Sequence, residues 1–250
     1  MSASSRRNFL QSSTAALAGT FIAEAGQAAP AEQGSPPALP ASRAFAAIHQ
    51  PKPLPFDPAK LNGISEKLIR SHWENNYGGS VKTLNAVKLK LAQALADKDT
   101  PAFAYDDLKR EHLMRTGSVV LHELYFENIG GNGKADADVR KTVGDAFSDF
   151  NTWETEFRKI ATGLSGGSGW VILGFNTQFG QMENYWLADH LHGPATTVPL
   201  LVMDMYEHSY QMDYGAAASK YIDAFFQNVP WEKVAQRLAR AQRFATLASA

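Results

Sequence analysis

Hydrophobic positions in the first half of the chain recur with a helical period. Helical spacing begins after Ser65, a residue type that caps helix N-termini, and runs through His72. The pattern resumes after the glycine pair at 78–79, where we expect a kink or a local irregularity. A second long helix is predicted over about 105–129 and ends at a glycine-rich stretch. The two helices predict an antiparallel hairpin.

The second half of the chain mixes helical and strand patterns. Amphipathic helices are predicted at 139–150 and 153–164, and further helices at 206–228 and 231–250. Short apolar runs predict strands at 170–175, 182–187 and 198–203. The order of these elements predicts an α+β fold. In this fold an N-terminal antiparallel helical hairpin precedes a C-terminal α/β domain with a small, about three-stranded, antiparallel sheet.

The N-terminus has the pattern of a targeting segment. Arg6 and Arg7 precede a mildly apolar stretch over about 14–23, and a small-x-small cleavage pattern follows at 23–25. This arrangement resembles a twin-arginine signal peptide, which we predict over residues 1–28. We therefore expect an exported protein that is periplasmic or extracellular.

Proline and alanine dominate the segment that follows the predicted signal peptide. Because proline removes a backbone donor and restricts φ, residues 29–53 predict an extended linker. The helical hairpin domain is expected over 54–133. The C-terminal α/β domain is expected over 134–250.

The charge balance and the absence of cysteine limit the classes of function. The chain has 24 Lys and Arg against 25 Asp and Glu, which gives no bulk field to hold nucleic acid. We therefore expect no nucleic-acid partner, and the N-terminal apolar stretch is too short for stable membrane insertion. The lack of cysteine leaves His, Asp and Glu as candidate metal ligands.

Two histidines lie on apolar faces of the predicted hairpin helices. His72 and His122 would meet if the two helices pair side by side. Burying an imidazole costs free energy unless it has a partner, and a metal ion would supply a partner to both. His49, in the predicted linker, is interpreted as a solvated side chain.

A carboxylate and a third histidine follow a predicted buried strand. Asp204 ends the strand, and His208 lies one helical turn later. The D-x-x-x-H spacing alone is a weak signal. Three histidines and one aspartate on apolar segments form a stronger pattern, which suits iron, manganese or zinc.

The same segments resemble those of a known enzyme family. Residues 204–214 resemble D-x-W-E-H-A-Y-x-x-D-Y, the C-terminal signature of iron/manganese superoxide dismutases. Residues 64–72 match the first helix of that family, 120–126 match its second-ligand segment, and 167–170 match its G-S-G-W motif. The resemblance covers roughly residues 54–238.

The resemblance implies a superoxide dismutase with one iron or manganese ion per subunit and superoxide as its substrate. The implied ligands are His72, His122, Asp204 and His208. It also implies a homodimer in which Glu207 hydrogen bonds to the partner's His208. The sequence does not choose between iron and manganese.

The residues expected around the metal depart from the family pattern. Asn76 stands where the family has a histidine, and Ser80 replaces its gateway tyrosine. We expect both to line the approach to the metal. Tyr77 is the nearest phenol that could substitute, and Tyr206 replaces the tryptophan of the signature.

Further departures lie at the entrance and the dimer interface of the family. Gln211 replaces an interface tyrosine, and Ala218 replaces the funnel arginine, so that Lys220 is the nearest cation. His190 is the expected outer-sphere residue that tunes the metal, as the resemblance implies. His192 is interpreted as a surface residue.

Two other classes of function use the same ligands. One is a metal-binding or interaction protein on the same fold, in which the altered gate has removed dismutation. The other is a zinc hydrolase, which the absence of an H-E-x-x-H motif disfavours. A phosphate loop at 166–169 is disfavoured because no Gly-Lys-Ser/Thr follows the glycines.

Overall fold

The computed structural model describes residues 43–248 of the chain. The predicted signal peptide at 1–28 and most of the predicted linker lie outside the described residues. Both stay predictions, as does the expected export. Within 43–248, no helix combines the length and the apolar character that crossing a membrane requires.

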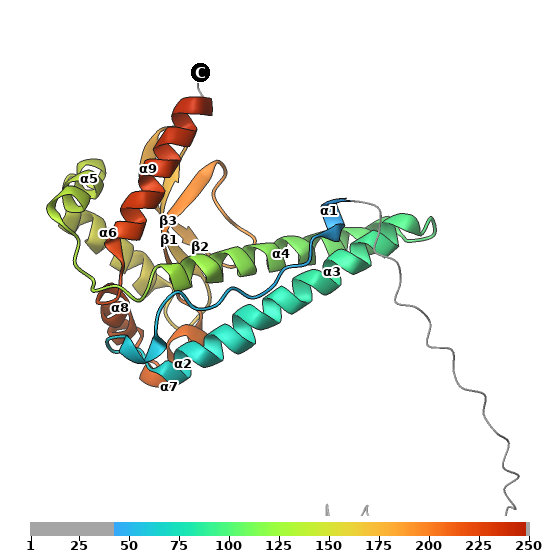
Figure 1. The fold of residues 1–250 in the computed structure, drawn as a ribbon, viewed down its shortest axis with the longest axis horizontal. Coiled ribbons are helices and arrows are strands. Elements are labelled where there is room, and N and C mark those ends of the chain that lie inside the picture. Colours follow the sequence, from blue (N-terminus) through green and yellow to red (C-terminus); the bar gives the residue numbers. More distant parts are fainter. Residues whose placement is uncertain (1–42, 249–250) are drawn as a thin grey trace, which may run out of the picture. The chain divides into compact units, whose positions relative to one another are not determined.

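Helices dominate both halves, and a single sheet lies in the second half (Figure 1). The α-helices are α1 (Arg43–Ala46), α2 (Glu66–Ser71), α3 (Gly78–Ala96), α4 (Ala102–Glu127), α5 (Ala137–Phe147), α6 (Phe150–Gly163), α7 (Gln211–Tyr214), α8 (Ala218–Phe226) and α9 (Trp231–Ala248). Other helical turns are η1 (Pro58–Lys60), η2 (His72–Tyr77) and η3 (Glu207–Ser209). The strands are β1 (Trp170–Asn176), β2 (Gln181–Leu187) and β3 (Thr197–Asp204). The predicted α+β fold is confirmed.

The hairpin begins at the predicted cap. The Ser65 hydroxyl accepts a hydrogen bond from the Leu68 amide at 3.1 Å and donates to Asp213 at 2.7 Å. The cap therefore satisfies an otherwise unpaired amide of the first turn and also ties α2 to the C-terminal half. Helices α3 and α4 then pack against each other as an antiparallel pair joined by a short turn.

The irregularity expected at the glycine pair lies one turn earlier than predicted. Residues 72–77 form the π-helical turn η2, while Gly78 and Gly79 begin the regular helix α3. A π-helical turn inserts one extra residue per turn and rotates the side chains that follow it. It therefore decides which of Asn76, Tyr77 and Ser80 faces the core, and helical periodicity could not predict that outcome.

The three strands form an antiparallel sheet in the order β2-β1-β3. Strand β1 is buried along its whole length, because it is the central strand and both faces of the sheet are covered. Its register pairs Trp170 with Asp204, and the ladder is irregular between Leu173 and Gly174. The pairing places the end of β3 beside the start of β1.

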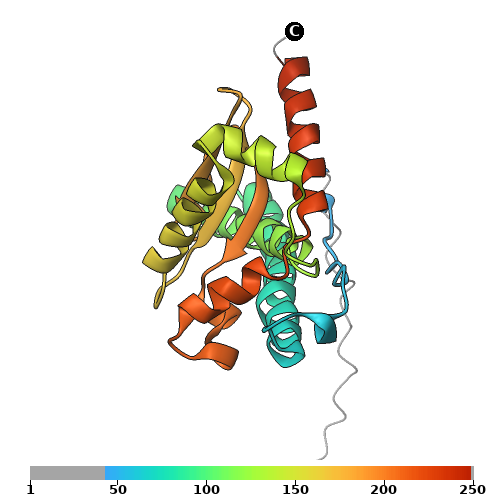
Figure 2. The same ribbon diagram turned by 90° about the vertical axis from the view of Figure 1, so that its left-hand side faces the viewer.

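Helices cover both sides of this sheet (Figure 2). Helix α6 packs on β1 and β2, whereas α4 packs on β3 from the hairpin side. The sheet and helices share a core of large aromatic side chains that are at most 1 % exposed. These are Tyr77, Tyr125, Trp153, Phe157, Trp170, Tyr210, Tyr221 and Phe225. Through this core, β3 packs directly against α4.

The segment predicted as helical over 206–228 is helical but interrupted. The segment divides into η3, α7 and α8. Gly215 ends α7 with φ +53°, a conformation that interrupts a right-handed helix. The Ser209 hydroxyl contacts the Asp204 carbonyl oxygen at 2.9 Å, so the turn after β3 is held tightly against the strand end.

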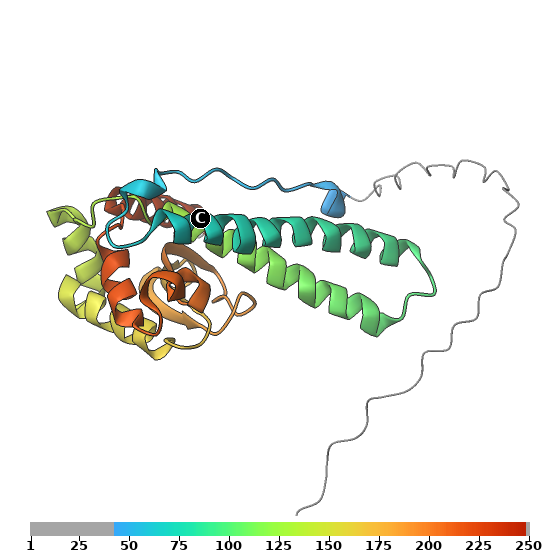
Figure 3. The same ribbon diagram turned by 90° about the horizontal axis from the view of Figure 1, so that it is seen from below.

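The described end of the predicted linker is docked on the hairpin. Residues 47–57 run extended alongside α3 (Figure 3). The interpretation of His49 as solvated is wrong: the side chain is half-buried, and its Nε2 lies 3.2 Å from Lys88 Nζ. The His49 amide and carbonyl each hydrogen bond to the side-chain amide of Asn85 at 2.9 Å.

Candidate metal centre

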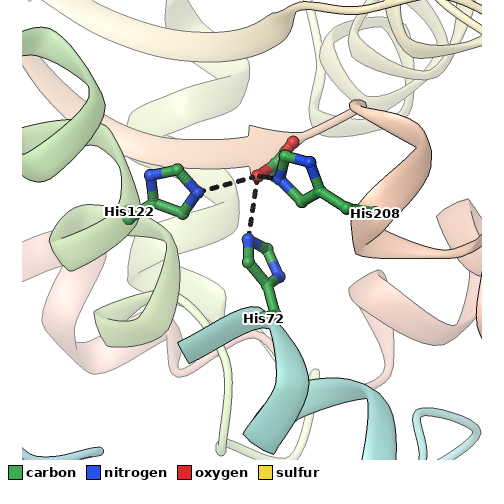
Figure 4. Close-up of side chains that lie close together, drawn as sticks. His72, His122 and His208 are labelled. Atoms are coloured by element: carbon green, nitrogen blue, oxygen red, sulfur yellow. Dashed lines mark hydrogen bonds and ion pairs between the residues drawn. The ribbon is translucent and has the colours of Figure 1, made fainter. Parts of the chain in front are cut away.

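Four side chains from four separate segments converge between the hairpin and the sheet. One ligand atom from each lies within 4.8 Å of the other three. The residues are His72 of η2, His122 of α4, Asp204 at the end of β3 and His208 of η3. Figure 4 shows the three imidazoles directed toward one carboxylate oxygen. The four residues that the sequence offered as ligands therefore lie close enough together to bind a single ion.

The carboxylate of Asp204 is the centre of this arrangement. Its Oδ2 lies 3.2 Å from His72 Nε2, 3.7 Å from His122 Nε2 and 3.3 Å from His208 Nε2. Its Oδ1 accepts a hydrogen bond from the Tyr206 amide at 2.8 Å. Because one oxygen is held by the backbone, the other is fixed toward the imidazoles.

Asp204 is ionised although it is fully buried. Burial alone would raise the pKa of its carboxyl. The charge and hydrogen bond of His208, together with the contact to His72, outweigh burial and hold the pKa well below its usual range. A negative ligand is therefore available to a cation at ordinary pH.

The imidazoles of His72 and His122 are buried in their neutral form. Burial lowers the pKa of His72 more than the Asp204 carboxylate raises it. Burial, reinforced by the neighbouring His72, lowers the pKa of His122 to about 3. Neutral imidazoles and an ionised carboxylate are the protonation states in which these groups bind a metal.

Several nitrogens of this cluster lack a hydrogen-bond partner within the described part of the chain. They are both ring nitrogens of His72 and Nε2 of His122, on residues that are 1 % exposed. A buried polar atom left unpaired costs roughly 1–3 kcal/mol. An ion among the three imidazoles and the carboxylate would satisfy the two Nε2 atoms, so the residues present fit a mononuclear metal.

The ring of His122 is oriented by a residue that the sequence did not point to. Its Nδ1 lies 2.7 Å from the carbonyl oxygen of Ser118, one helical turn earlier. Because a carbonyl only accepts, the proton sits on Nδ1 and the lone pair of Nε2 faces Asp204. The i−4 spacing on a helix is the signal that could have identified Ser118.

The expected outer-sphere residue lies beside the ligands. His190 has its ring 5.9 Å from that of His122 and stacks on Tyr206 at 4.8 Å. The Trp170 indole donates to His190 Nδ1 at 3.0 Å, which leaves the proton of the neutral ring on Nε2. Burial lowers the pKa of His190, so the neutral form is favoured.

The three residues predicted to rebuild the gate occupy different environments. Ser80 is 5 % exposed, and its hydroxyl shares a 2.8 Å hydrogen bond with the hydroxyl of Ser118. Tyr77 is buried with its ring 6.4 Å from that of His122, whereas Asn76 is half-buried. Ser80 is thus hydrogen bonded to Ser118, the residue that also contacts the ring of His122.

The remaining candidates lie toward solvent. Glu207 is exposed, and its carboxylate forms no ion pair among the described residues. Gln211 and Lys220 are exposed as well, while Ala218 is buried at the start of α8. His192 is an exposed residue that contacts Asp189, in agreement with its interpretation as a surface residue.

The glycine-rich segment before β1 is a tight turn. Gly169 has φ +144°, and a Cβ there would lie 2.3 Å from the Leu187 carbonyl oxygen. The Ser168 hydroxyl donates to the Ala188 carbonyl at 3.1 Å. These contacts explain Gly169 by backbone packing in a tight turn, as the sequence suggested.

Comparison with known proteins agrees with this geometry. A family model described as "Iron/manganese superoxide dismutases, C-terminal domain" matches residues 135–237. A relative from Cupriavidus metallidurans named "Superoxide dismutase [Fe]" is 47% identical over 196 residues, which cover 78% of this chain and 99% of the relative.

More distant relatives carry either metal in their names. "Superoxide dismutase [Fe]" of Aquifex aeolicus is 34% identical over 74% of this chain and 89% of its own length. "Superoxide dismutase [Mn]" of Mycolicibacterium fortuitum is 30% identical over 71% of this chain and 86% of its own length. With its four converging ligands and these relatives, the chain belongs to the iron/manganese superoxide dismutase family.

Proposed function

We propose that the protein is a superoxide dismutase with a single iron or manganese ion at the four-residue centre. In the reaction, two superoxide anions and two protons yield one dioxygen and one hydrogen peroxide. The observation that carries the proposal is the set of three imidazoles and one carboxylate, in which the Nε2 atoms of His72 and His122 have no hydrogen-bond partner among the described residues. The relatives named superoxide dismutases support it.

When bound, the metal supplies the one-electron chemistry by alternating between its +3 and +2 states. The protein residues hold and surround it. Asp204 provides the negative charge, and the Ser118 carbonyl keeps the His122 lone pair directed inward. His190 holds a proton at Nε2 beside the centre, and the His208 side chain, 26 % exposed, lies nearest to solvent.

The metal can be identified by reconstitution. Metal-free protein would be reloaded with iron or with manganese in separate samples, and each sample would be assayed for metal content and dismutation. We expect about one ion per chain and activity with at least one of the two metals. Stable loading with either metal but no activity with both would instead support a metal-binding protein without dismutase function.

We also propose a symmetric homodimer formed around Glu207 and His208. Glu207 is exposed next to a ligand, and within the described chain its carboxylate has no cationic partner. In a two-fold arrangement each Glu207 would reach the partner's His208, so that one contact occurs twice. The bridge would fix the orientation of a metal ligand across the interface.

Sedimentation measures this dimer directly. Glu207→Ala should weaken dimerisation by about 100-fold or more, because truncating one partner of a buried charge pair costs about 2–5 kcal/mol. Glu232→Ala, at an exposed position in the first turn of α9, is the control and should leave the dimer intact. A metal-loaded wild-type protein that sediments only as a monomer would refute the dimer.

A further inference from the structure

We propose that Lys52 is a positioning residue for the metal centre, because it connects the π-helical turn that carries His72 to the helix that carries His122. The residue lies in the extended segment 47–57, outside both helices. The inference rests on the metal centre described above. It requires that a metal binds at this centre, and it does not require that the bound metal dismutates superoxide.

The backbone of Lys52 is bound by both ends of the turn η2. Its amide donates to the Tyr77 hydroxyl at 2.8 Å, and its carbonyl accepts from the Trp73 indole at 2.8 Å. Trp73 directly follows the ligand His72, and Tyr77 is the last residue of the turn. One residue therefore holds the start and the end of the π-helical turn together.

The side chain of Lys52 extends this connection to α4. Its ammonium forms an ion pair with Glu123, the residue directly after the ligand His122. The Tyr77 hydroxyl donates to the other oxygen of the same carboxylate at 2.9 Å. Lys52, Tyr77 and Glu123 thus form a closed ring of contacts that joins η2 to α4.

The Lys52–Tyr77–Glu123 contacts act on the metal centre mainly through Tyr77, and less through the ion pair alone. The Lys52 side chain is 64% exposed, and an isolated exposed pair contributes little to stability. The Tyr77 phenol, however, is buried and lies within ring-contact distance of His122 and Phe126, at 6.4 Å and 6.0 Å. A shift of Glu123 or Tyr77 is therefore transmitted directly to a ligand ring.

Two prolines flank Lys52 and restrict the backbone around it. Pro51 and Pro53 have no amide hydrogen, so Lys52 carries the single backbone donor of the three residues. Pro53 also favours an extended conformation at Lys52. The donor and the carbonyl are therefore presented to η2 with little loss of conformational entropy on folding.

The same segment is anchored a few residues earlier. Asn85 binds both backbone groups of His49, and the Lys88 ammonium donates to the Ala47 carbonyl at 2.7 Å. Both anchors lie on α3, which continues directly from η2. Lys52 is thus held in place along the hairpin, and its ammonium is presented to Glu123.

A π-helical turn needs such outside support. The i→i+5 pattern is less stable than the α-helical pattern and occurs mostly as single turns at functional sites. Among the described residues, neither ring nitrogen of His72 has a hydrogen-bond partner, and the side chain contacts Asp204 at 3.2 Å, so the backbone of η2 largely sets where this ligand lies. Removing the contacts of Lys52 would therefore change the position of His72 more than the stability of the core.

The test compares metal-loaded Lys52→Met, Lys52→Arg and Lys60→Met. Lys60 is the control because it is an exposed lysine in the same part of the chain and, within residues 43–248, forms an ion pair with Asp57 alone. Metal release to a chelator should become about 10-fold faster in Lys52→Met, the lower range for residues that support metal ligands. The EPR spectrum of the bound metal should change as well.

Rescue and coupling distinguish positioning from general stabilisation. Lys52→Arg should restore most of the wild-type release rate and spectrum, and Lys60→Met should match wild type. Tyr77→Phe breaks the same ring of contacts, so adding Lys52→Met to it should have a smaller effect than Lys52→Met alone. Thermal unfolding of each variant would be recorded in parallel.

The outcomes separate this inference from the proposed function. Unchanged release and spectra in Lys52→Met and in Tyr77→Phe would overturn it. A lower unfolding temperature with an unchanged spectrum would also overturn it, since that result indicates a purely structural role. Altered spectra in a protein whose wild type does not dismutate superoxide would support the inference while the proposed function fails.

Discussion

Replacing Asp204 by alanine should yield a folded protein that has lost both its metal and its dismutase activity. Asp204 is the only carboxylate of the ligand set, and its Oδ2 contacts all three imidazoles. Without it, the remaining ligands are three imidazoles, which carry no negative charge to offset that of a multivalent cation. Metal content should fall from about one ion per chain to below about a tenth of that value.

Two further variants make this result specific. Asp204→Asn keeps the shape and the acceptor for the Tyr206 amide but removes the charge, so it should fold and bind metal weakly. Asp223→Ala removes an exposed carboxylate that pairs with Arg158 and should retain metal and activity. Full metal content in Asp204→Ala would show that the ion binds elsewhere.

Gly117→Ala should strongly lower activity although Gly117 is not one of the four metal ligands. A Cβ at this position of α4 would lie 1.9 Å from the His190 carbonyl oxygen, so the loop that carries His190 must move. The movement would break the hydrogen bond from Trp170 and the stacking on Tyr206. Activity should fall about 10- to 100-fold, as for other residues that support a metal site, with metal still bound.

Gly79→Ala is the matched control. Gly79 also lies in a helix, and a Cβ there meets nothing within 4 Å. Since alanine is favoured over glycine in a helix interior, this variant should be more stable by up to about 1 kcal/mol with unchanged activity. Equal activity in the two variants, measured at equal metal content, would mean that the position of His190 does not matter.

The ligands could be predicted from sequence because their signals are local. His72 and His122 stand on apolar helix faces, and Asp204 and His208 flank a strand end at one-turn spacing. A buried imidazole requires a partner wherever the helix packs. The physical need for a partner therefore pointed to a metal site, and the resemblance to the superoxide dismutase signature made the ligand set specific.

The surroundings of the site could not be predicted in the same way. The π-helical turn η2 shifts the side chains after His72, and helical periodicity did not reveal the hydrogen bond between Ser80 and Ser118. The contact between Gly117 and His190 joins a helix to a loop with no periodic pattern. Such contacts depend on tertiary packing, which residue spacing does not encode.

The contacts of residues 47–57 could not be predicted from sequence either. Its proline content predicted an extended conformation, which residues 47–57 adopt. Composition suggested a linker, yet Asn85 and Lys88 bind its backbone and Lys52 reaches the turn η2. Single polar side chains on the partner helix make these contacts, and nothing within the segment itself reveals them.

The stoichiometry of superoxide consumption by metal-loaded wild-type protein tests the central claim most directly. Superoxide would be generated as a pulse, and its decay would be recorded together with the dioxygen and hydrogen peroxide formed. A dismutase must consume two superoxide anions for each hydrogen peroxide and release one dioxygen, and Asp204→Ala should show only the uncatalysed decay. Decay at the uncatalysed rate with metal fully bound, or peroxide formed without dioxygen, would contradict dismutation at this centre.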